Sequence, residues 1–195
     1  MTEQTSAWPP CCCVAAYVAT ALCICGHPTI DRAWLARQLG IRVGPTDENP
    51  WGLPLASDPS LRGLLLSEAE GRIPAVLHQF NSNLSFRHIP FRDVTLNLFS
   101  DLLDQAIAQK CVTGAGFNRA LIFPAPAPIR HVARILPHST PEQVVILDDT
   151  AGVPPAKLAA AWSALETAVY GIDDGFWLIG KERALKLEYA PDIGS

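Results

Sequence analysis

Three adjacent cysteines, Cys11-Cys12-Cys13, are the residues of this chain best suited to chemistry. They follow Pro9-Pro10 and open an apolar stretch that carries no charge before Asp31. Proline breaks a helix from within but can precede one, so we expect a helix to begin here. A cysteine in the first turn of a helix faces the positive end of the macrodipole, which favours the nucleophilic thiolate. The stretch therefore predicts a reactive thiol at the tip of a buried helix.

The cysteines admit other roles, which the sequence leaves open. Free cysteine is often only a small buried hydrophobe, and thiols also bind soft metal ions. Cys23 and Cys25, combined with the three adjacent cysteines, match no zinc-binding spacing, so we expect no metal and no cofactor. Five of the six cysteines lie between positions 11 and 25. That crowding is unlike the disulfide framework of a secreted protein and favours a reducing, cytoplasmic location.

Composition narrows the class of protein further. The 195 residues suit one domain with a proper core, and 49% of them are apolar against 17% charged, which is typical of a folded chain. A formal net charge of −4 argues against nucleic acid as a partner, because nucleic-acid binding calls for a basic patch. The apolar stretch lacks the basic residues that open a signal peptide, and it is too short to span a bilayer. We expect neither a membrane nor a nucleic acid as partner.

A reactive thiol needs a framework, and the hydrophobic pattern predicts one in two halves. Helices are expected first, at residues 12–25, 30–39 (between Thr29 as N-cap and Gly40), 61–70 and 93–111. Strands are expected at residues 75–80, 120–123, 131–136, 143–147 and 175–180, with a helix at 154–170. Helices followed by an antiparallel sheet are typical of the α+β class. We expect one domain over residues 1–195, with a helical half at about 1–112 and a sheet half at about 113–190.

A cysteine nucleophile also needs a base, and the base needs an acceptor that orients it. His131 begins a predicted strand, and the next predicted strand ends in Asp148-Asp149. If the turn between them is centred between Ser139 and Thr140, His131 lies directly opposite Asp148. Their Cβ atoms would then be roughly 4.5–5.5 Å apart. A slip of one residue would bring Asp149 there instead, so the choice of aspartate stays open.

A set of short motifs resembles the catalytic domain of phytochelatin synthases, which belong to the papain-like cysteine peptidase clan. The motifs are Cys12-Cys13-Val14-Ala15-Ala16, Phe117-Asn118-Arg119-Ala120, Arg130-His131-Val132, Val145-Ile146-Leu147-Asp148, Pro154-Pro155, Trp162 and Asp174-Gly175-Phe176-Trp177-Leu178-Ile179. Their order and spacing agree with the family over residues 113–180. The resemblance implies a papain-like fold, with the buried nucleophile helix packed on a C-terminal antiparallel sheet.

The resemblance also implies roles for individual residues. Cys12 would be the nucleophile, His131 its base and Asp148 the residue that orients the base. Cys11 and Cys13 remain alternative nucleophiles, and Asp149 remains the alternative acid. Gln4 would help to stabilise the oxyanion, and the residues expected near the substrate are Asn118, Arg119 and Arg130.

The implied activity is cysteine-dependent acyl transfer on a small peptide or amide through a thioester, as a thiol protease or as a transferase. The implied donor is glutathione or a related thiol peptide. Two departures leave the donor open: Arg130 replaces the family's glycine before the histidine, and residues 149–153 lack the family's basic side chains. An amide-forming acyltransferase that uses a carrier-bound thioester is an alternative. A non-catalytic papain-fold binding protein, or a thiol or metal protein, is another.

Overall fold

The computed structural model describes residues 8–9, 11–27, 29–93, 96–118, 120, 130–140, 142–148, 150, 156–160 and 175–186. These residues form an α+β fold around a six-stranded sheet with strand order β1-β6-β2-β3-β4-β5. All neighbouring strands pair in antiparallel fashion. The strands are β1 (Leu84–Pro90), β2 (Val112–Asn118), β3 (Arg130–Ile135), β4 (Val144–Asp148), β5 (Ala156–Ala160) and β6 (Gly175–Lys181).

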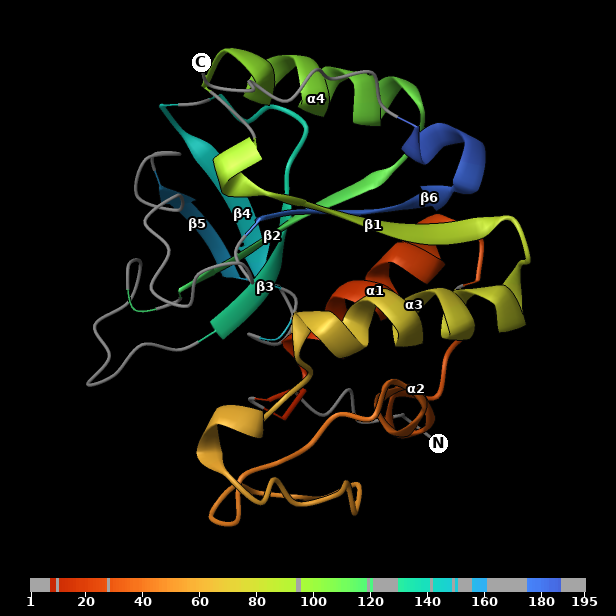
Figure 1. The fold of residues 1–195 in the computed structure, drawn as a ribbon, viewed down its shortest axis with the longest axis vertical. Helices are drawn as coiled ribbons and strands as arrows, with labels where there is room; N and C mark the ends of the chain where they lie inside the picture. The colour runs from red at the N-terminus through yellow and green to blue at the C-terminus, as the bar shows by residue number, and fades with distance from the viewer. Residues whose placement is uncertain are drawn as a thin grey trace.

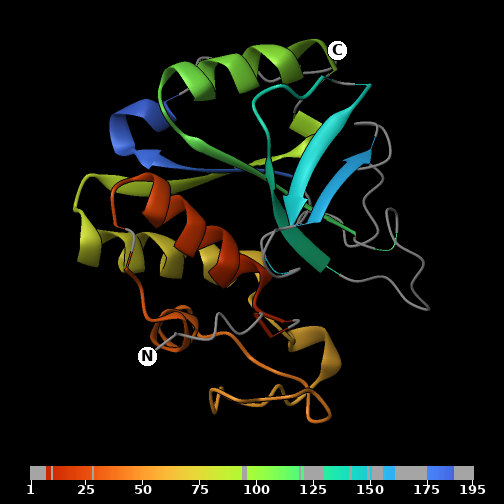
Figure 2. The ribbon, with the colours of Figure 1, turned by 180° about the vertical axis from the view of Figure 1, so that it is seen from behind.

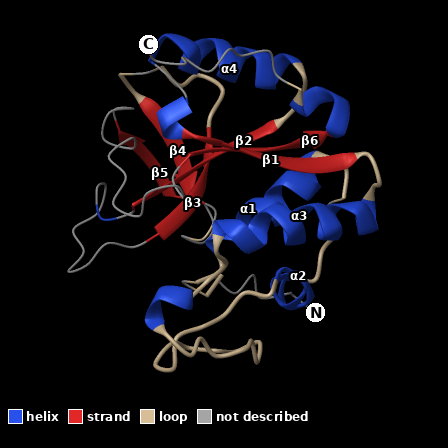
Figure 3. Cartoon of the chain, viewed as in Figure 1, coloured by secondary structure: helices blue, strands red, loops and turns tan. Residues whose placement is uncertain are grey.

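Helices cover the two faces of this sheet. Helices α1 (Cys13–Ile24) and α3 (Leu66–Phe80) lie along one face, with α2 (Arg32–Leu39) outside them, and α4 (Leu96–Ala108) lies on the other face (Figures 1 and 3). The view from behind shows the same order of layers (Figure 2). Three short 3-10 helices complete the described elements: η1 (Pro59–Leu61), η2 (Phe91–Asp93) and η5 (Glu182–Leu185).

Two hydrophobic clusters fill the spaces between these layers. The α1-side cluster joins the buried residues of α1, α2 and α3 to strand residues that include Val112, Val132, Trp177 and Ile179. The α4-side cluster joins α4 to the alternate strand residues, among them Ala115, Phe117, Ala133, Phe176 and Leu178. Since successive side chains of a strand point to opposite faces, the two clusters lie on opposite faces of one sheet.

Tyr17 fixes α1 on the sheet. Its hydroxyl lies 2.9 Å from the carbonyl oxygen of Val112 and 3.0 Å from that of Trp177, and it donates to them. The ring also meets the Trp177 indole edge to face, with 6.3 Å between the centroids. Helix α1 is therefore tied to β2 and β6 at the same point.

The helix predictions hold where local signals mark the ends. The predicted helices at 12–25 and 93–111 correspond to α1 and α4, and Gly40 ends α2 with a φ of 70°. The N-cap of α2 is Asp31, which accepts from the backbone N–H of Trp34 at 2.8 Å, so the prediction of Thr29 was wrong. A carboxylate directly before the helix satisfies an N–H group that Thr29, two residues earlier, does not reach.

The extent of α3 shows that two predictions were wrong. The helix expected at 61–70 begins only at Leu66, and the strand expected at 75–80 is the last part of the same helix. The chain continues through Pro74 because its apolar residues keep the helical period. The buried members are Leu66, Ala69, Ile73, Val76 and Leu77, all in the α1-side cluster.

The strands expected at 131–136, 143–147 and 175–180 are confirmed within one or two residues as β3, β4 and β6. Strands β1 and β2 were not predicted, and β1 comes from the half of the chain that we expected to be helical. The first residues of the helix expected at 154–170 form β5, which pairs with β4 along all five residues. The remainder of that helix, and residues 121–123 of the strand expected at 120–123, lie outside the described residues.

Candidate functional site: a thiol pair at the start of α1

Cys12 is the N-cap of α1 and Cys13 is its first residue. The backbone N–H of Cys12 donates to the Pro9 carbonyl at 2.9 Å, and its own carbonyl accepts from Ala16 at 2.8 Å. The chain therefore turns just before Cys12 and continues directly into α1. The first turn of α1 holds no acidic residue. The first N–H groups of the helix therefore have no carboxylate from their own turn as an acceptor. They can donate hydrogen bonds to a thiolate or to an oxyanion.

Cys11 and Cys12 form a thiol pair, with 3.9 Å between their Sγ atoms. Both are buried: 6% of Cys11 and none of Cys12 is exposed. A hydrogen bond from the Cys12 thiol holds the pKa of Cys11 below its ordinary value, although burial opposes that shift. The same hydrogen bond, together with burial and the charges of Cys11 and Cys13, raises the pKa of Cys12. Because the two thiols share one hydrogen bond, ionisation of one sulfur disfavours ionisation of the other.

An ion pair lies beside these thiols. Arg62 Nε is 2.7 Å from Asp47 Oδ2, and that oxygen also accepts from the Gly44 N–H at 2.7 Å. The Arg62 charge lowers the pKa of Cys11, and the Asp47 charge raises it. The sequence pattern had pointed to neither residue, because both lie in a stretch interpreted only as loop.

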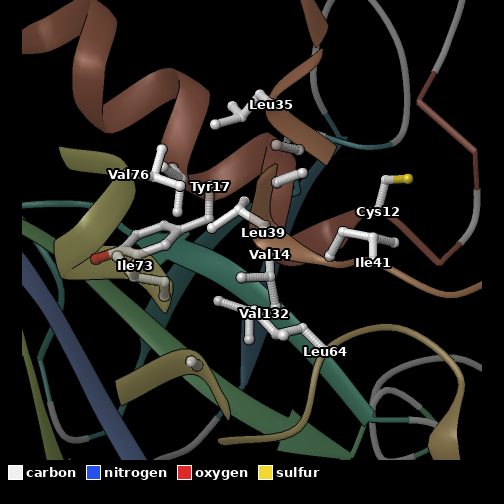
Figure 4. Packing of buried hydrophobic residues seen from close by; sticks show 14 of the residues in the cluster. Cys12, Val14, Tyr17, Leu35, Leu39, Ile41, Leu64, Ile73, Val76 and Val132 are labelled. Atoms are coloured by element: carbon white, nitrogen blue, oxygen red, sulfur yellow. The ribbon is translucent and has the colours of Figure 1, made fainter. Parts of the chain in front are cut away.

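The 41–64 segment closes over the thiol pair. Backbone bridges join Arg42 to Gly63 and Val43 to Leu55, so the segment doubles back on itself. Its apolar residues Ile41, Val43, Leu53 and Leu64 belong to the same cluster as Cys11 and Cys12. In Figure 4, the Cys12 sulfur points away from the centre of that cluster, where Tyr17 and Leu39 lie. The thiols are thus covered at the rim of the α1-side cluster and not in its middle.

Aromatic contacts fasten the chain that leads into the site. The Trp8 ring meets Trp51 of the 41–64 segment edge to face at 5.5 Å. The Arg32 guanidinium lies 5.1 Å from the centre of the Trp8 ring. Such a stack of cation and rings stabilises the approach to Cys11 against both α2 and the 41–64 segment.

His131 is the second residue of β3, and it is buried. Figures 1 and 2 both place the N-terminal end of α1 beside the first residues of β3, so the two chain segments expected to carry the nucleophile and the base come together. The described contact of the His131 ring is with Phe117, directly opposite on β2, at 5.6 Å between centroids. Phe117 belongs to the α4-side cluster, and Cys12 to the α1-side cluster. No described contact joins His131 to either buried thiol.

The pairing of β3 with β4 differs from the predicted register. Arg134 pairs with Leu147 and Ile135 with Ile146, so Asp148 continues the ladder opposite Ala133 and not opposite His131. The predicted direct opposition was wrong by two residues. The cause lies in the turn, where Thr140 and Gln143 exchange two backbone hydrogen bonds of 3.1 Å and so centre it further along the chain. The backbone of Asp148 therefore lies two positions before the place opposite His131.

The structure places two of the three predicted substrate contacts together. Asn118 at the end of β2 and Arg130 at the start of β3 are directly opposed. By strand alternation both share a face with Val132, which packs in the α1-side cluster. The Asn118 side chain also accepts from the Ala120 N–H at 3.1 Å. Gln4, Arg119, Asp149 and the side chain of Asp148 lie outside the described residues.

Two further features of the described residues bear on the class of protein. Across them, no group of three or more His, Cys, Asp or Glu side chains has an arrangement that would hold a metal ion. None of the helices in the same part of the chain combines the length and the apolar character needed to cross a bilayer.

Comparison of the chain with protein-family models and with curated proteins finds no match.

Proposed function

We propose that this protein catalyses cysteine-dependent acyl transfer, with the Cys11–Cys12 thiol pair as the source of the nucleophile. The observation that carries the proposal is the position of the pair at the N-terminus of a buried helix whose first turn has no acidic residue. A negative sulfur is stabilised there by the helix dipole and by the neighbouring thiol. A purely structural cysteine needs neither feature.

The proposed reaction has two stages. The Cys12 sulfur, after passing its proton to the neighbouring thiolate or to a base, attacks the carbonyl carbon of a peptide or amide. The carbonyl becomes an oxyanion that the first N–H groups of α1 can stabilise. The C–N bond then breaks, the amine leaves with a proton, and a thioester on Cys12 remains. Water or an incoming amine next attacks the thioester, which releases the acyl product and restores the thiolate.

His131 is proposed as the base that returns the proton to the leaving amine, with Asp148 as the residue that orients it. The proposal rests on the resemblance to phytochelatin synthases alone, because the described contact of the His131 ring is with Phe117 of the α4-side cluster, whereas the thiol pair belongs to the α1-side cluster. A papain-like arrangement and a glutathione-type donor follow from the same resemblance.

A direct test is mass spectrometry of the protein after incubation with glutathione, together with measurement of free glycine. Wild type and Cys13→Ser should release glycine and carry an acyl adduct, and Cys12→Ala should do neither. Cys13→Ser is the matched control because Cys13 adjoins the pair and is only half buried. An adduct that persists in Cys12→Ala would transfer the nucleophile to Cys11, or to Cys13 if Cys13→Ser forms none. If neither glutathione nor an activated ester such as p-nitrophenyl acetate leaves an adduct, acyl transfer is rejected.

A further inference from the structure

We propose that the Cys11–Cys12 thiol pair is also a binding site for a single Cu(I) ion, which the two sulfurs hold as thiolates. Two S–H bonds break, two Cu–S bonds form, both protons leave to solvent and no electron is transferred. The proposal goes beyond acyl transfer and does not depend on it, because the ion can bind whether or not either sulfur attacks a carbonyl.

The distance between the two sulfurs suits one bridging ion. The Sγ atoms of Cys11 and Cys12 lie 3.9 Å apart. Thiolates bond zinc at about 2.3 Å, and Cu(I)–S bonds are of similar length, so two sulfurs on one ion can lie at most about 4.6 Å apart. The pair meets this limit as it stands. The ion takes the place of the hydrogen that the two sulfurs share, and the backbone of Cys12 is already fixed by its bonds to Pro9 and Ala16.

The number of sulfurs selects the kind of ion. Structural Zn²⁺ takes four ligands, which is why zinc sites have recognisable spacings, whereas the softer Cu(I) is stable with two thiolates. Within the described ranges, no three His, Cys, Asp or Glu side chains are grouped so as to hold a metal ion. Ile41 and Leu64 belong to the same cluster as the pair, and apolar side chains cannot complete the shell of Zn²⁺. The site therefore favours an ion of low coordination number.

The charge of the complex suits the start of α1. One Cu(I) ion and two thiolates together carry a single negative charge, whereas Zn²⁺ with the same thiolates is neutral. The first turn of α1 has no acidic residue, and the first N–H groups of a helix stabilise negative charge. The Cys12 sulfur points away from the middle of the α1-side cluster (Figure 4), so the ion need not cross the core to reach it.

The test is titration of the reduced protein with Cu(I) in the absence of oxygen, in competition with the Cu(I) chelator bicinchoninate. Wild type should bind one copper ion per chain, counted by native mass spectrometry, and Zn²⁺ at the same concentration should not displace it. Cys11→Ser and Cys12→Ser should each weaken binding by at least about 100-fold, because losing a residue that merely orients a metal ligand already costs about 10–100-fold. X-ray absorption of the loaded protein should show two sulfur neighbours for each copper.

Cys13→Ser and Cys25→Ser are the matched controls, since each removes a half-buried cysteine at one end of the same helix. Both should bind one copper ion as wild type does. Iodoacetamide locates the ion: bound copper should slow alkylation of Cys11 and Cys12 and leave that of the exposed Cys23 unchanged. Equal copper affinity in wild type and the two serine variants of the pair, or loss of copper in Cys13→Ser, would overturn the proposal.

A second measurement needs no substitution in the buried pair, and so remains decisive if a serine variant fails to fold. Phenylarsine oxide condenses with two neighbouring thiols, forming two As–S bonds and releasing one water molecule. One equivalent should attach to the wild-type peptide that contains Cys11 and Cys12, and one equivalent of Cu(I), added first, should prevent this. An arsenical that attaches to the pair equally well with and without copper would overturn the proposal.

The outcome separates from that of the proposed function. One copper ion at the pair, without an acyl adduct on the metal-free protein, would keep the copper site and reject acyl transfer. An acyl adduct on a protein that binds no copper would keep acyl transfer and reject the copper site. If both hold, copper-loaded protein should not be acylated by p-nitrophenyl acetate, because the metal occupies the sulfur of Cys12.

Discussion

The ring of Tyr17 lies so close to the backbone of Gly114 that a Cβ at position 114 would stand 2.7 Å from Tyr17 Cε2. The same Cβ would stand 3.1 Å from the carbonyl oxygen of Ala133. Glycine is therefore required at this point of β2, since both the ring and the neighbouring strand occupy the space that a side chain needs. The contact fixes the depth at which α1, and with it the thiol pair, sits on the sheet.

Gly114→Ala should destabilise the protein by about 1–3 kcal/mol, because the new methyl group displaces Tyr17 or separates β2 from β3. Urea unfolding measures the change. Gly71→Ala in α3 is the control, since a Cβ there meets nothing within 4 Å. Alanine in a helix interior is more favourable than glycine by roughly 0.5–1 kcal/mol, so the control should be more stable than wild type. If the two variants change the free energy of unfolding equally, the packing of Tyr17 does not require glycine at position 114.

Asn49→Ala should expose the thiol pair. The Asn49 amide donates to the Leu53 carbonyl at 2.9 Å and accepts from the Leu53 N–H at 2.7 Å, which folds the 41–64 segment. Without both bonds, the closed form of the segment should lose on the order of 1 kcal/mol of stability. Iodoacetamide should therefore label Cys11 and Cys12 about fivefold faster or more. The pH midpoint of this labelling should not move.

Two internal references accompany this measurement. Cys23 is exposed in the structure, so its labelling should be the same in both proteins. Ser57→Ala changes an exposed residue of the same segment and should leave the rates at Cys11 and Cys12 unchanged. Rates that stay at the wild-type value in Asn49→Ala would mean that the segment does not limit access to the thiols.

The ion pair of Glu68 with Arg42 should make stability depend on acid pH. Burial raises the pKa of the Glu68 carboxyl, but hydrogen bonds from Arg42 and from the Leu65 N–H, with the charges of Arg42 and Arg72, hold it below its ordinary value of 4.5. A carboxyl whose pKa is lowered by folding stabilises the fold above its unfolded pKa. That contribution disappears as the pH falls through the folded pKa.

Urea unfolding of wild type and Glu68→Gln between pH 7 and pH 3 tests this dependence. Wild type should be more stable by about 1–2 kcal/mol at pH 7, and the difference should shrink below pH 4.5. Glu70→Gln, at an exposed position of the same helix, should differ from wild type by less than about 0.5 kcal/mol. A difference for Glu68→Gln that persists at pH 3 would contradict the assignment.

Two aspartates are candidates for the residue that orients His131, and substitution distinguishes them. The described part of β4 ends at Asp148. If acyl transfer is observed, Asp148→Asn should lower its rate by about 10²-fold, and Asp149→Asn should stay within about twofold of wild type. The measurement is glycine release at saturating glutathione. A larger loss in Asp149→Asn would transfer the orienting role to Asp149.

The sequence predicted those features that local chemistry determines. The Pro-Pro pair located the start of α1, and Gly40 located the end of α2. Short strand-like segments rich in apolar residues located β3, β4 and β6. Strand β2 was missed because Gly114 and Gly116 weaken its strand pattern, although Gly114 leaves the space that Tyr17 of α1 occupies.

The parts that were missed depend on contacts distant in sequence. Residues 75–80 have a strand-like composition, yet they complete α3 because packing against the α1-side cluster outweighs local propensity. The register of β3 and β4 depended on a turn whose centre a single sequence does not fix. Arg62 and Asp47 are fifteen positions apart in a loop, and only the folded 41–64 segment brings them into contact.

The position of β6 between β1 and β2 has a consequence for the synthesis of the chain. The Tyr17 hydroxyl donates to the Trp177 carbonyl of β6. Helix α1 therefore lacks one of the contacts that hold it on the sheet until residues 175–181 have been translated. At about 5–20 residues per second, the ribosome needs on the order of ten seconds or more to pass from the cysteines to that strand. Throughout that interval Tyr17 lacks one of the two hydrogen bonds that fix α1, and with it the thiol pair, on the sheet. The docking of the first helix is therefore completed only when the strand nearest the end of the chain has been inserted.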